Sequence, residues 1–553
     1  MRSFVLAAVA LAFVGILTPR AQSSRPPLAP ADVDAIVRLV ALEDTRQFDR
    51  ETLGTLVRST HPEVRRRAVV AIGRIVNPGG PALLADLRRD PDQEIVATVA
   101  FATGQLKDPD AVPWLSQSLT GPAPVAFEAA RALGKIRTPA AWSALSQYLA
   151  SATLTPANAG AIGEALLSIG RFTERQDVAP IVRWTTSQSE EVRWRAAWAL
   201  FRPRNPAAVT HLLKLTDDPS PEVRFWAMRG LTPALVTEAG LEPGPISARL
   251  RSAVRDGDRR VRTEALRSLV LCDDDASFAA ALSALDANDA WMAVSAAEQM
   301  GRFKSRVDLV VPRLIAAAGG SRPLSVRLTA LAPLAALSPE SAAGPAGALA
   351  REKSDVARSM ARQTLLKLGD AGKAQLATLE QPDAKPEAPP ARPAPIVRSE
   401  DDYRRIVQRW IVSSYDGAAP VRAVLTTPRG EIEVAVHGSE APLGAEHFVT
   451  LVETGAIVGT EFGRVVPNFV AQQRPIRGAA LLRDEVSRLG LTRGNVSWAS
   501  AGLDTGRPGY TFGSTPQPHN EGDFTALGRV VRGMEAVDRL ELGDAIVAAR
   551  MVK

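Results

Sequence analysis

Residues 461–472 are the stretch of this chain with the most distinctive chemical content. They read Glu-Phe-Gly-Arg-Val-Val-Pro-Asn-Phe-Val-Ala-Gln and place Arg464, Phe469 and Gln472 at relative positions 0, +5 and +8. The arginine is a rigid planar fork of N–H donors, the phenylalanine offers an apolar ring, and the glutamine offers an amide. None of the three is a nucleophile or a usual metal ligand.

The rest of the chain has no motif for metal, phosphate or nucleophilic chemistry. Its five histidines have no partner at metal-ligand spacing, and the single cysteine, Cys272, adds none. No glycine-rich loop precedes a phosphate-binding lysine, and no serine stands in a nucleophile-elbow context. We therefore expect no metal and no cofactor, and we expect any chemistry to lie near the C-terminus.

The elements around this stretch are predicted to be strands, because apolar and polar residues alternate from Arg422 onward. A hairpin is expected around Pro428-Arg429-Gly430. Helices are expected over 443–454, closed by Gly455, and over 534–540. Further strands are expected over 462–472, 494–499, 524–531 and 546–552. Many short strands with two helices favour a closed β-barrel that is capped at its ends.

Several phrases in residues 420–553 resemble the cyclophilin-type peptidyl-prolyl isomerases, and they occur in the family's order. They are Arg429-Gly430-Glu431-Ile432, Ala441-Pro442 before His447-Phe448-Val449, Phe462 to Phe469, Asp484-Glu485, Pro518 to Gly522, and Gly528 to Met534. The resemblance implies a cyclophilin-like barrel that isomerises X-Pro bonds. Rotation about such bonds is slow because the amide is conjugated, and its catalysis requires no cofactor.

By this resemblance Arg464 would donate a hydrogen bond toward the prolyl nitrogen. Phe469 would form the floor of the proline pocket, and Gln472 would position the arginine or the substrate backbone. The resemblance implies further pocket positions at Val470, Ala499, Ser500, Tyr510, Thr511, Phe512, His519 and Phe524.

The chain departs from the family pattern within this pocket. Thr511 stands where the family has a pocket phenylalanine, and the loss removes roughly 1–3 kcal/mol of apolar contact. Tyr510 or Phe512 would compensate by facing Phe469, which would favour an enzyme. An open polar floor would instead favour a module that only binds proline-containing peptides.

A repeated phrase over residues 30–375 predicts an array of paired helices. The phrase Pro62-Glu63-Val64-Arg65 recurs every 30 to 38 residues, except for one gap of 67 that would hold a degenerate unit near Ile162. Such a period is typical of a helical solenoid, whose units bury their apolar faces by stacking. The pattern resembles HEAT repeats. The apolar anchors are Val64, Ile95, Val125, Val192, Val223, Val261, Met292, Val326 and Val356.

Two recurring residue types in the array are interpreted as structural. The arginines are expected to link adjacent repeats, and the aromatic residues are expected to fill the core between them. The arginines are Arg65, Arg193, Arg224, Arg262 and Arg327, and the aromatic residues are Trp194, Trp198, Phe225 and Trp226.

A proline-rich segment over 379–398 is predicted to be an extended spacer that lets the two domains move independently. A connecting helix over 401–414 should follow it, with Tyr403, Ile406, Trp410 and Ile411 on one side.

The first 21 residues have the layout of a secretory signal peptide, with an apolar run over 4–17 that is short for a permanent membrane span. One cysteine allows no internal disulfide, so we expect a bacterial periplasmic or secreted protein. The net charge of +6 rests on scattered arginines and only nine lysines, so we expect no nucleic acid partner.

The sequence thus predicts a multidomain chain, an all-α HEAT-like superhelical solenoid followed by a cyclophilin-like closed β-barrel with capping helices. The solenoid would hold a protein partner, and the barrel would isomerise proline-containing polypeptide clients. The alternative is a non-catalytic scaffold whose degenerate barrel only binds such peptides.

Overall fold

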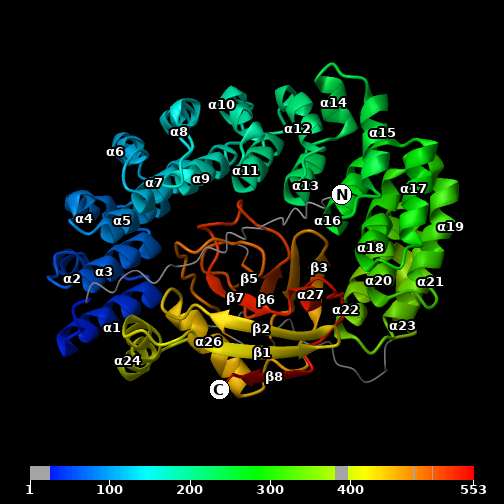
Figure 1. Cartoon of the computed structure of the whole chain (residues 1–553). Helices are drawn as coiled ribbons and strands as arrows, with labels where there is room; N and C mark the ends of the chain where they lie inside the picture. Colours follow the sequence, from blue (N-terminus) through cyan, green and yellow to red (C-terminus); the bar gives the residue numbers. More distant parts are fainter. Residues whose placement is uncertain (1–24, 380–395, 477–479, 501, 553) are drawn as a thin grey trace, which may run out of the picture.

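The computed structural model describes residues 25–379, 396–476, 480–500 and 502–552. A curved array of helices partly surrounds a small barrel (Figure 1). The predicted signal segment 1–21 and residues 380–395 of the predicted linker lie outside the described residues. Among the helices that are described, none has both the length and the hydropathy needed to cross a bilayer.

The solenoid consists of two layers of helices. The inner helices are α1 (Pro30–Thr45), α3 (Pro62–Ile75), α5 (Gln93–Leu106), α7 (Ala123–Ile136), α9 (Ala159–Ile169), α11 (Glu190–Phe201), α13 (Pro221–Arg229), α16 (Arg259–Leu269), α18 (Ala290–Gln299), α20 (Leu324–Leu337) and α22 (Asp355–Leu365). The remaining helices are α2 (Arg50–Leu56), α4 (Gly80–Leu84), α6 (Val112–Ser118), α8 (Pro139–Ser151), α10 (Ala179–Val182), α12 (Val209–Leu215), α14 (Pro233–Glu238), α15 (Pro243–Ala253), α17 (Asp275–Leu285), α19 (Val307–Ala318), α21 (Pro339–Leu349) and α23 (Gly369–Ala377).

The repeat period predicted from the sequence corresponds to the inner helices. All nine anchor residues are buried, each at the start of one inner helix. The degenerate unit is α9, where Ile162 is fully buried. A proline at the first position of α3 and of α13 fits the helix start, because its missing N–H would have no helical partner there. The predicted solenoid is therefore confirmed.

The recurring arginines link adjacent repeats, as predicted. Arg193 lies 2.7 Å from Asp218, and Arg224 lies 2.9 Å from Asp256, in each case an acid on the following repeat. The same guanidinium groups donate to carbonyl oxygens in the turn just before their own helix. Arg65, Arg262 and Arg327 make the corresponding ion pairs.

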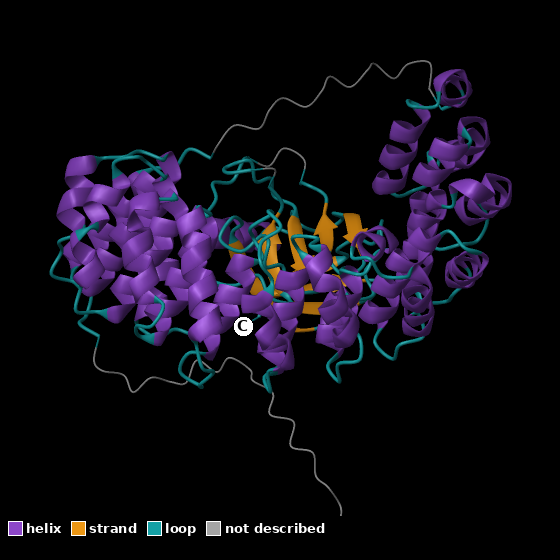
Figure 2. Ribbon diagram, turned by 90° about the horizontal axis from the view of Figure 1, so that it is seen from above, coloured by secondary structure: helices purple, strands orange, loops and turns teal. Residues whose placement is uncertain are grey.

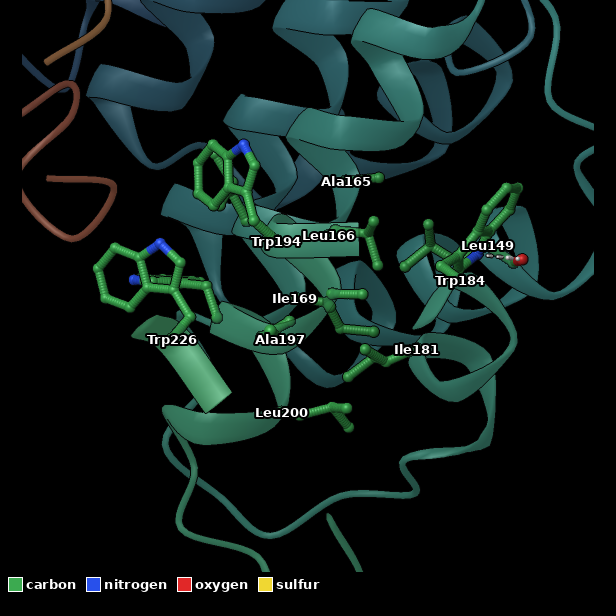
Figure 3. Packing of buried hydrophobic residues seen from close by; sticks show 14 of the residues in the cluster. Leu149, Ala165, Leu166, Ile169, Ile181, Trp184, Trp194, Ala197, Leu200 and Trp226 are labelled. Carbon is green, nitrogen blue, oxygen red and sulfur yellow. Dashed lines mark hydrogen bonds between the residues drawn. The ribbon is translucent and has the colours of Figure 1, made fainter. Parts of the chain in front are cut away.

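Aromatic side chains fill the space between α11 and α13 (Figure 3). Trp198, Phe225 and Trp226 are at most 1% exposed, and Trp194 and Trp226 stack with their rings 6.3 Å apart. These residues form repeat core, as predicted.

A helical segment joins the solenoid to the barrel. It comprises α24 (Glu400–Ile406), a π-helical turn over Val407–Val412 and α25 (Ser413–Tyr415). Its apolar side, including Trp410, is buried in one cluster with α1 and the barrel. Asp44 of α1 accepts hydrogen bonds from Arg398 and Tyr403, so the first solenoid helix is bound to the segment that leads into the barrel.

The barrel is an eight-stranded antiparallel sheet with the order β3-β4-β6-β5-β7-β2-β1-β8. A bridge between Glu461 and Ala545 joins its two edges, so the sheet closes. Helices α26 (Pro442–Glu453) and α27 (Met534–Val537) accompany it. The strands are β1 (Arg422–Thr427), β2 (Gly430–Val436), β3 (Phe462–Val466), β4 (Val470–Gln473), β5 (Asn495–Trp498), β6 (Tyr510–Gly513), β7 (Ala526–Arg532) and β8 (Ala548–Met551).

Two local predictions in the barrel were wrong or incomplete. Residues 462–472 are not one strand but the hairpin of β3 and β4. The chain reverses between them at Asn468, whose φ of 61° is left-handed and incompatible with a continuous strand. Strand β6 was not predicted, because four residues are too few for their alternation to be recognised as a strand.

The sequence left open whether the two domains dock against each other, and in the structure they do. The barrel is docked against the concave side of the solenoid, and both views show the strands between helices (Figures 1 and 2). Arg74 of α3 donates to the carbonyl oxygens of Glu485 and Val486, and Arg131 of α7 donates to that of Arg488. At the other end, the N-terminus of α22 donates two backbone hydrogen bonds to the carboxylate of Glu461.

Candidate active site

A row of polar side chains crosses four neighbouring strands on the outside of the barrel. The strand register places Arg464 of β3 opposite Gln472 of β4, Gln472 opposite Thr511 of β6, and Thr511 opposite Ser497 of β5. Directly opposed residues share a face of a sheet, so the four side chains form one line. Arg464 Nη1 lies 3.4 Å from Gln472 Oε1, and the hydroxyl groups of Ser497 and Thr511 are 2.6 Å apart.

An aromatic ring lies beside this row. The Arg464 guanidinium lies 5.4 Å from the ring centroid of Phe469, within the range of a cation–π contact. His519 stacks with Phe469 at 5.6 Å between the centroids and an interplanar angle of 28°. Arg464 is exposed, and both rings are partly exposed. The structure therefore brings Arg464, Phe469, Gln472 and His519 together at one partly exposed surface, and the buried Thr511 lies next to Gln472 in the same row.

The turn that carries Phe469 is held by the solenoid. The buried Asn468 side chain donates to the carbonyl oxygen of Arg260 and to the carboxylate of Glu264, at 2.9 Å each. Arg267 of the same helix, α16, donates to the carbonyl oxygen of Pro467 at 3.3 Å. These contacts fix the turn, and with it the ring of Phe469.

Tyr510 and Phe512 do not line the site, which corrects the pocket assignment made from the sequence. Both are fully buried inside the barrel, where Tyr510 packs against Phe448 and Phe512 against Phe462. The cause is the alternation of β6, which directs Thr511 outward and its two neighbours inward. The place of the missing pocket aromatic is therefore occupied by the Thr511 and Ser497 hydroxyls.

The other positions implied by the resemblance lie at the edges of this surface. Val470 is buried on the same face of β4 as Gln472. Ala499 and Ser500 follow β5 and are partly exposed, and the Ala499 N–H donates to the carbonyl oxygen of Gly509. Phe524 is partly exposed beyond the loop of His519. No contact found among the described residues joins Ser500 or Phe524 to Phe469.

His519 is held in its neutral form. Burial, followed by the positive charges of Arg202, Arg229 and Arg171, lowers the pKa of its imidazole to about 4. At neutral pH the ring therefore acts as an uncharged partner for Phe469. Within the described ranges, no group of three or more His, Cys, Asp and Glu residues is placed to hold a metal ion.

Sequence reasoning missed three contributors to this region. Ser497 lies two residues before Ala499 in the predicted strand, but only the register pairs it with Thr511. Asn468 was part of the quoted stretch without an assigned role. The solenoid arginines near His519 had no signal at all, because the docking of the domains was not predicted.

Known proteins share this C-terminal region. The family model described as cyclophilin type peptidyl-prolyl cis-trans isomerase/CLD matches residues 422–553. Peptidyl-prolyl cis-trans isomerase B of Bacillus subtilis is 30% identical over 129 residues, which cover 22% of this chain and 90% of that protein. The chain belongs to the cyclophilin-type peptidyl-prolyl isomerase family.

Other matches also cover only part of this chain. Peptidyl-prolyl cis-trans isomerase-like 2 of Cryptococcus neoformans is 31% identical over 132 residues, and the match spans 22% of this chain and 23% of that relative. A solved cyclophilin type isomerase from Cryptosporidium parvum aligns with 24% of this chain and 98% of its own, at 18% identity and a TM-score of 0.23. HEAT repeats match residues 80–162 and 152–232. The cyclophilin domain is thus one part of a chain that also contains HEAT repeats.

Proposed function

We propose that this chain catalyses cis-trans isomerisation of X-Pro bonds in polypeptides at the surface formed by Arg464, Phe469 and Gln472. The observation that carries the proposal is the position of Arg464, exposed over Phe469 and hydrogen-bonded to Gln472. Its other N–H groups face an apolar ring, within a domain of the isomerase family.

The chemistry follows from the amide. Resonance between the prolyl nitrogen and the carbonyl group sets a barrier of about 18–20 kcal/mol to rotation. A proline ring packed on Phe469 and His519 would place the prolyl nitrogen near Arg464. A hydrogen bond donated to that nitrogen localises its lone pair, removes double-bond character and lowers the barrier. No bond to the protein forms in this process.

A second candidate function rests on the floor of the site. Thr511 and Ser497 present hydroxyl groups where a second aromatic ring would otherwise grip the proline. A module with this floor would bind proline-containing segments without accelerating their isomerisation.

The rate of cis-to-trans conversion of a short X-Pro reporter peptide, measured with the full chain, separates the two. Uncatalysed conversion takes tens to hundreds of seconds. We expect the wild-type chain to accelerate the conversion. In Arg464→Ala the catalysed rate should fall by roughly a hundredfold, as it does when an enzyme loses one transition-state donor. Arg464 is exposed, so the variant should fold. A folded wild-type chain that binds the peptide without accelerating it would contradict isomerase function and support the binding module.

We also propose that residues 1–21 direct export to a periplasm or the cell exterior, and that protein partners bind the outer helices. The composition of the first residues supports export, and the occupation of the inner helices by the barrel supports the second point. Fractionation of a bacterial host, with mass analysis of the N-terminus, tests export. We expect a processed chain outside the cytoplasm, and an intact N-terminus in the cytosolic fraction would contradict this proposal.

A further inference from the structure

The two loops that carry the rings of the site are each bound to the solenoid. The carbonyl oxygen of Pro518, next to His519, accepts a hydrogen bond of 3.0 Å from Arg171, just after α9. The Pro467–Asn468 turn, next to Phe469, is bound to α16 by three hydrogen bonds. Helices α9, α11, α13 and α16 pack consecutively. The two loops therefore lie against the part of the solenoid that runs from α9 to α16, and Figure 1 shows the barrel on the inner side of these helices.

This region of the solenoid carries two arginines at the ends of inner helices, and one of them, Arg229, pairs with the carboxylate of Glu264. Arg202, which ends α11, is exposed and makes no ion pair with any described residue; its guanidinium lies 5.6 Å from the ring of Trp198. Arg229, the last residue of α13, lies over Phe201 and Trp226, and its nearest carboxylate is Glu264 at 3.8 Å.

The charges of these arginines lower the pKa of His519 in the site and the pKa of Arg202 itself. Arg202 and Arg229 both depress the pKa of His519, after the larger effect of burial. The pKa of Arg202 is itself lowered, first by burial and then by Arg229 and Arg204. Arg202 makes no ion pair with any described residue, so an acidic group on a ligand at the rings would meet a positive charge that no carboxylate neutralises.

We propose that the solenoid forms one wall of the substrate site, and that Arg202 and Arg229 select X-Pro segments with Asp or Glu within a few residues of the proline. The proline would lie on Phe469 and His519, and the acidic side chain would reach the ends of α11 and α13. This inference rests on the proposed function and names its substrate class. The preference would belong to the full chain, because both arginines are in the solenoid.

The test compares three reporter peptides that differ only in Glu, Gln or Lys beside the X-Pro bond, each measured for kcat/KM and for binding. For the full chain we expect kcat/KM and affinity to decrease in the order Glu, Gln, Lys. The Glu peptide should exceed the Gln peptide by roughly two- to tenfold, and by less at high salt. The double variant Arg202→Gln/Arg229→Gln should lose this preference, so that it uses the Glu and Gln peptides with equal kcat/KM.

Two controls separate charge from structure. The double variant Arg202→Lys/Arg229→Lys keeps the charge and should retain the preference. Arg313→Gln removes an exposed arginine from α19, an outer helix, and should change nothing.

Each outcome decides one proposal. Equal use of the three peptides by an active wild-type chain would overturn this inference and leave the proposed function standing. A second outcome is that no peptide is isomerised but the Glu peptide binds best, and that this preference is lost in the Arg202→Gln/Arg229→Gln variant. This outcome would overturn the proposed isomerase activity and support selection of acidic segments by the two arginines.

Discussion

At the scale of single residues, the site depends on how Phe469 is held. Its ring contacts Arg464 and His519, its backbone turn is bound to α16, and the ring itself stays partly exposed. A residue with this environment contributes to binding more than to folding. The two substitutions below follow from that environment and from the burial of His447, which contacts Tyr510.

Phe469→Ala should weaken binding of a proline peptide by about 1–3 kcal/mol, since it removes most of the apolar surface under the proline ring. The midpoint of urea unfolding should change little, because the side chain is only partly buried. Peptide titration and urea unfolding of the same preparation measure both effects. Unchanged peptide affinity would place the proline elsewhere.

His447 should make stability depend on pH. Its Nδ1 lies 3.1 Å from the Tyr510 hydroxyl, and burial, followed by Arg398, lowers its pKa to about 4. In the unfolded chain it titrates near 6.5, so the unfolded state binds more protons as pH falls from 6.5 toward 4, and the fold loses stability in this window.

We expect His447 to account for about 1 kcal/mol of the loss in unfolding free energy between pH 6.5 and 5, after allowance for its partial exposure. His447→Gln keeps an acceptor for Tyr510 but does not titrate, so its pH dependence should be flatter. Urea unfolding at both pH values gives the comparison, with parallel curves as the contrary result.

At the scale of elements, the solenoid was largely predictable and the barrel only in part. The anchor residues repeat at a regular period because each inner helix must bury the same apolar stripe. Strand β6 and the β3–β4 reversal were not predictable in the same way. Strand β6 is short, with Thr511 between two core aromatic residues. The β3–β4 reversal depends on the left-handed backbone of Asn468, and a single such residue produces no periodic pattern in the sequence.

The arginine ladder makes a prediction at this scale. Arg224 donates two hydrogen bonds of 2.9 Å to Asp256 and one of 2.8 Å to the carbonyl oxygen of Asp218. Arg224→Gln should cost roughly 1–3 kcal/mol, as expected for charge-assisted bonds at a partly buried site.

Because each repeat contacts mainly its neighbours, the effect of this substitution should stay local. Hydrogen exchange should increase in α13 and α16 and remain unchanged in α3 and α5. Arg313→Gln, on an exposed part of α19, is the matched control. Uniform exchange across the whole solenoid would contradict nearest-neighbour coupling.

At the scale of the whole molecule, the sequence could not predict docking. The contacts join residues hundreds of positions apart, such as Arg46 with Asp504 and Arg74 with Val486. They use arginine side chains and backbone carbonyl oxygens, and any surface loop offers such carbonyls. The proline-rich spacer predicted two domains. Their docking depends on charged side chains of the inner helices, which the spacer does not reveal.

Arg74 tests this arrangement. Its side chain is 2% exposed, pairs with Glu43 at 2.7 Å and donates to three carbonyl oxygens of the barrel domain, those of Glu440, Glu485 and Val486. Arg74→Met should lower the unfolding free energy by about 3–5 kcal/mol, because it leaves Glu43 buried without a cation. Hydrogen exchange over 484–488 should rise as the barrel loosens.

Glu43→Gln/Arg74→Met is the control for that experiment. It removes the isolated charge, so it should recover part of the stability but not the protection of 484–488. Full recovery of both would mean that Arg74 does not hold the barrel.

The docking of the barrel has a consequence for how the chain is made. Translation produces the solenoid first, with Arg131 and Glu128 on its inner face, while their partner Arg488 emerges more than three hundred residues later. Until then the nascent solenoid carries an unfinished, charged concave surface. The solenoid therefore reaches its final stability only after the barrel domain has been synthesised. A ribosome that stalls before residue 480 would release a solenoid without the barrel that covers its concave surface.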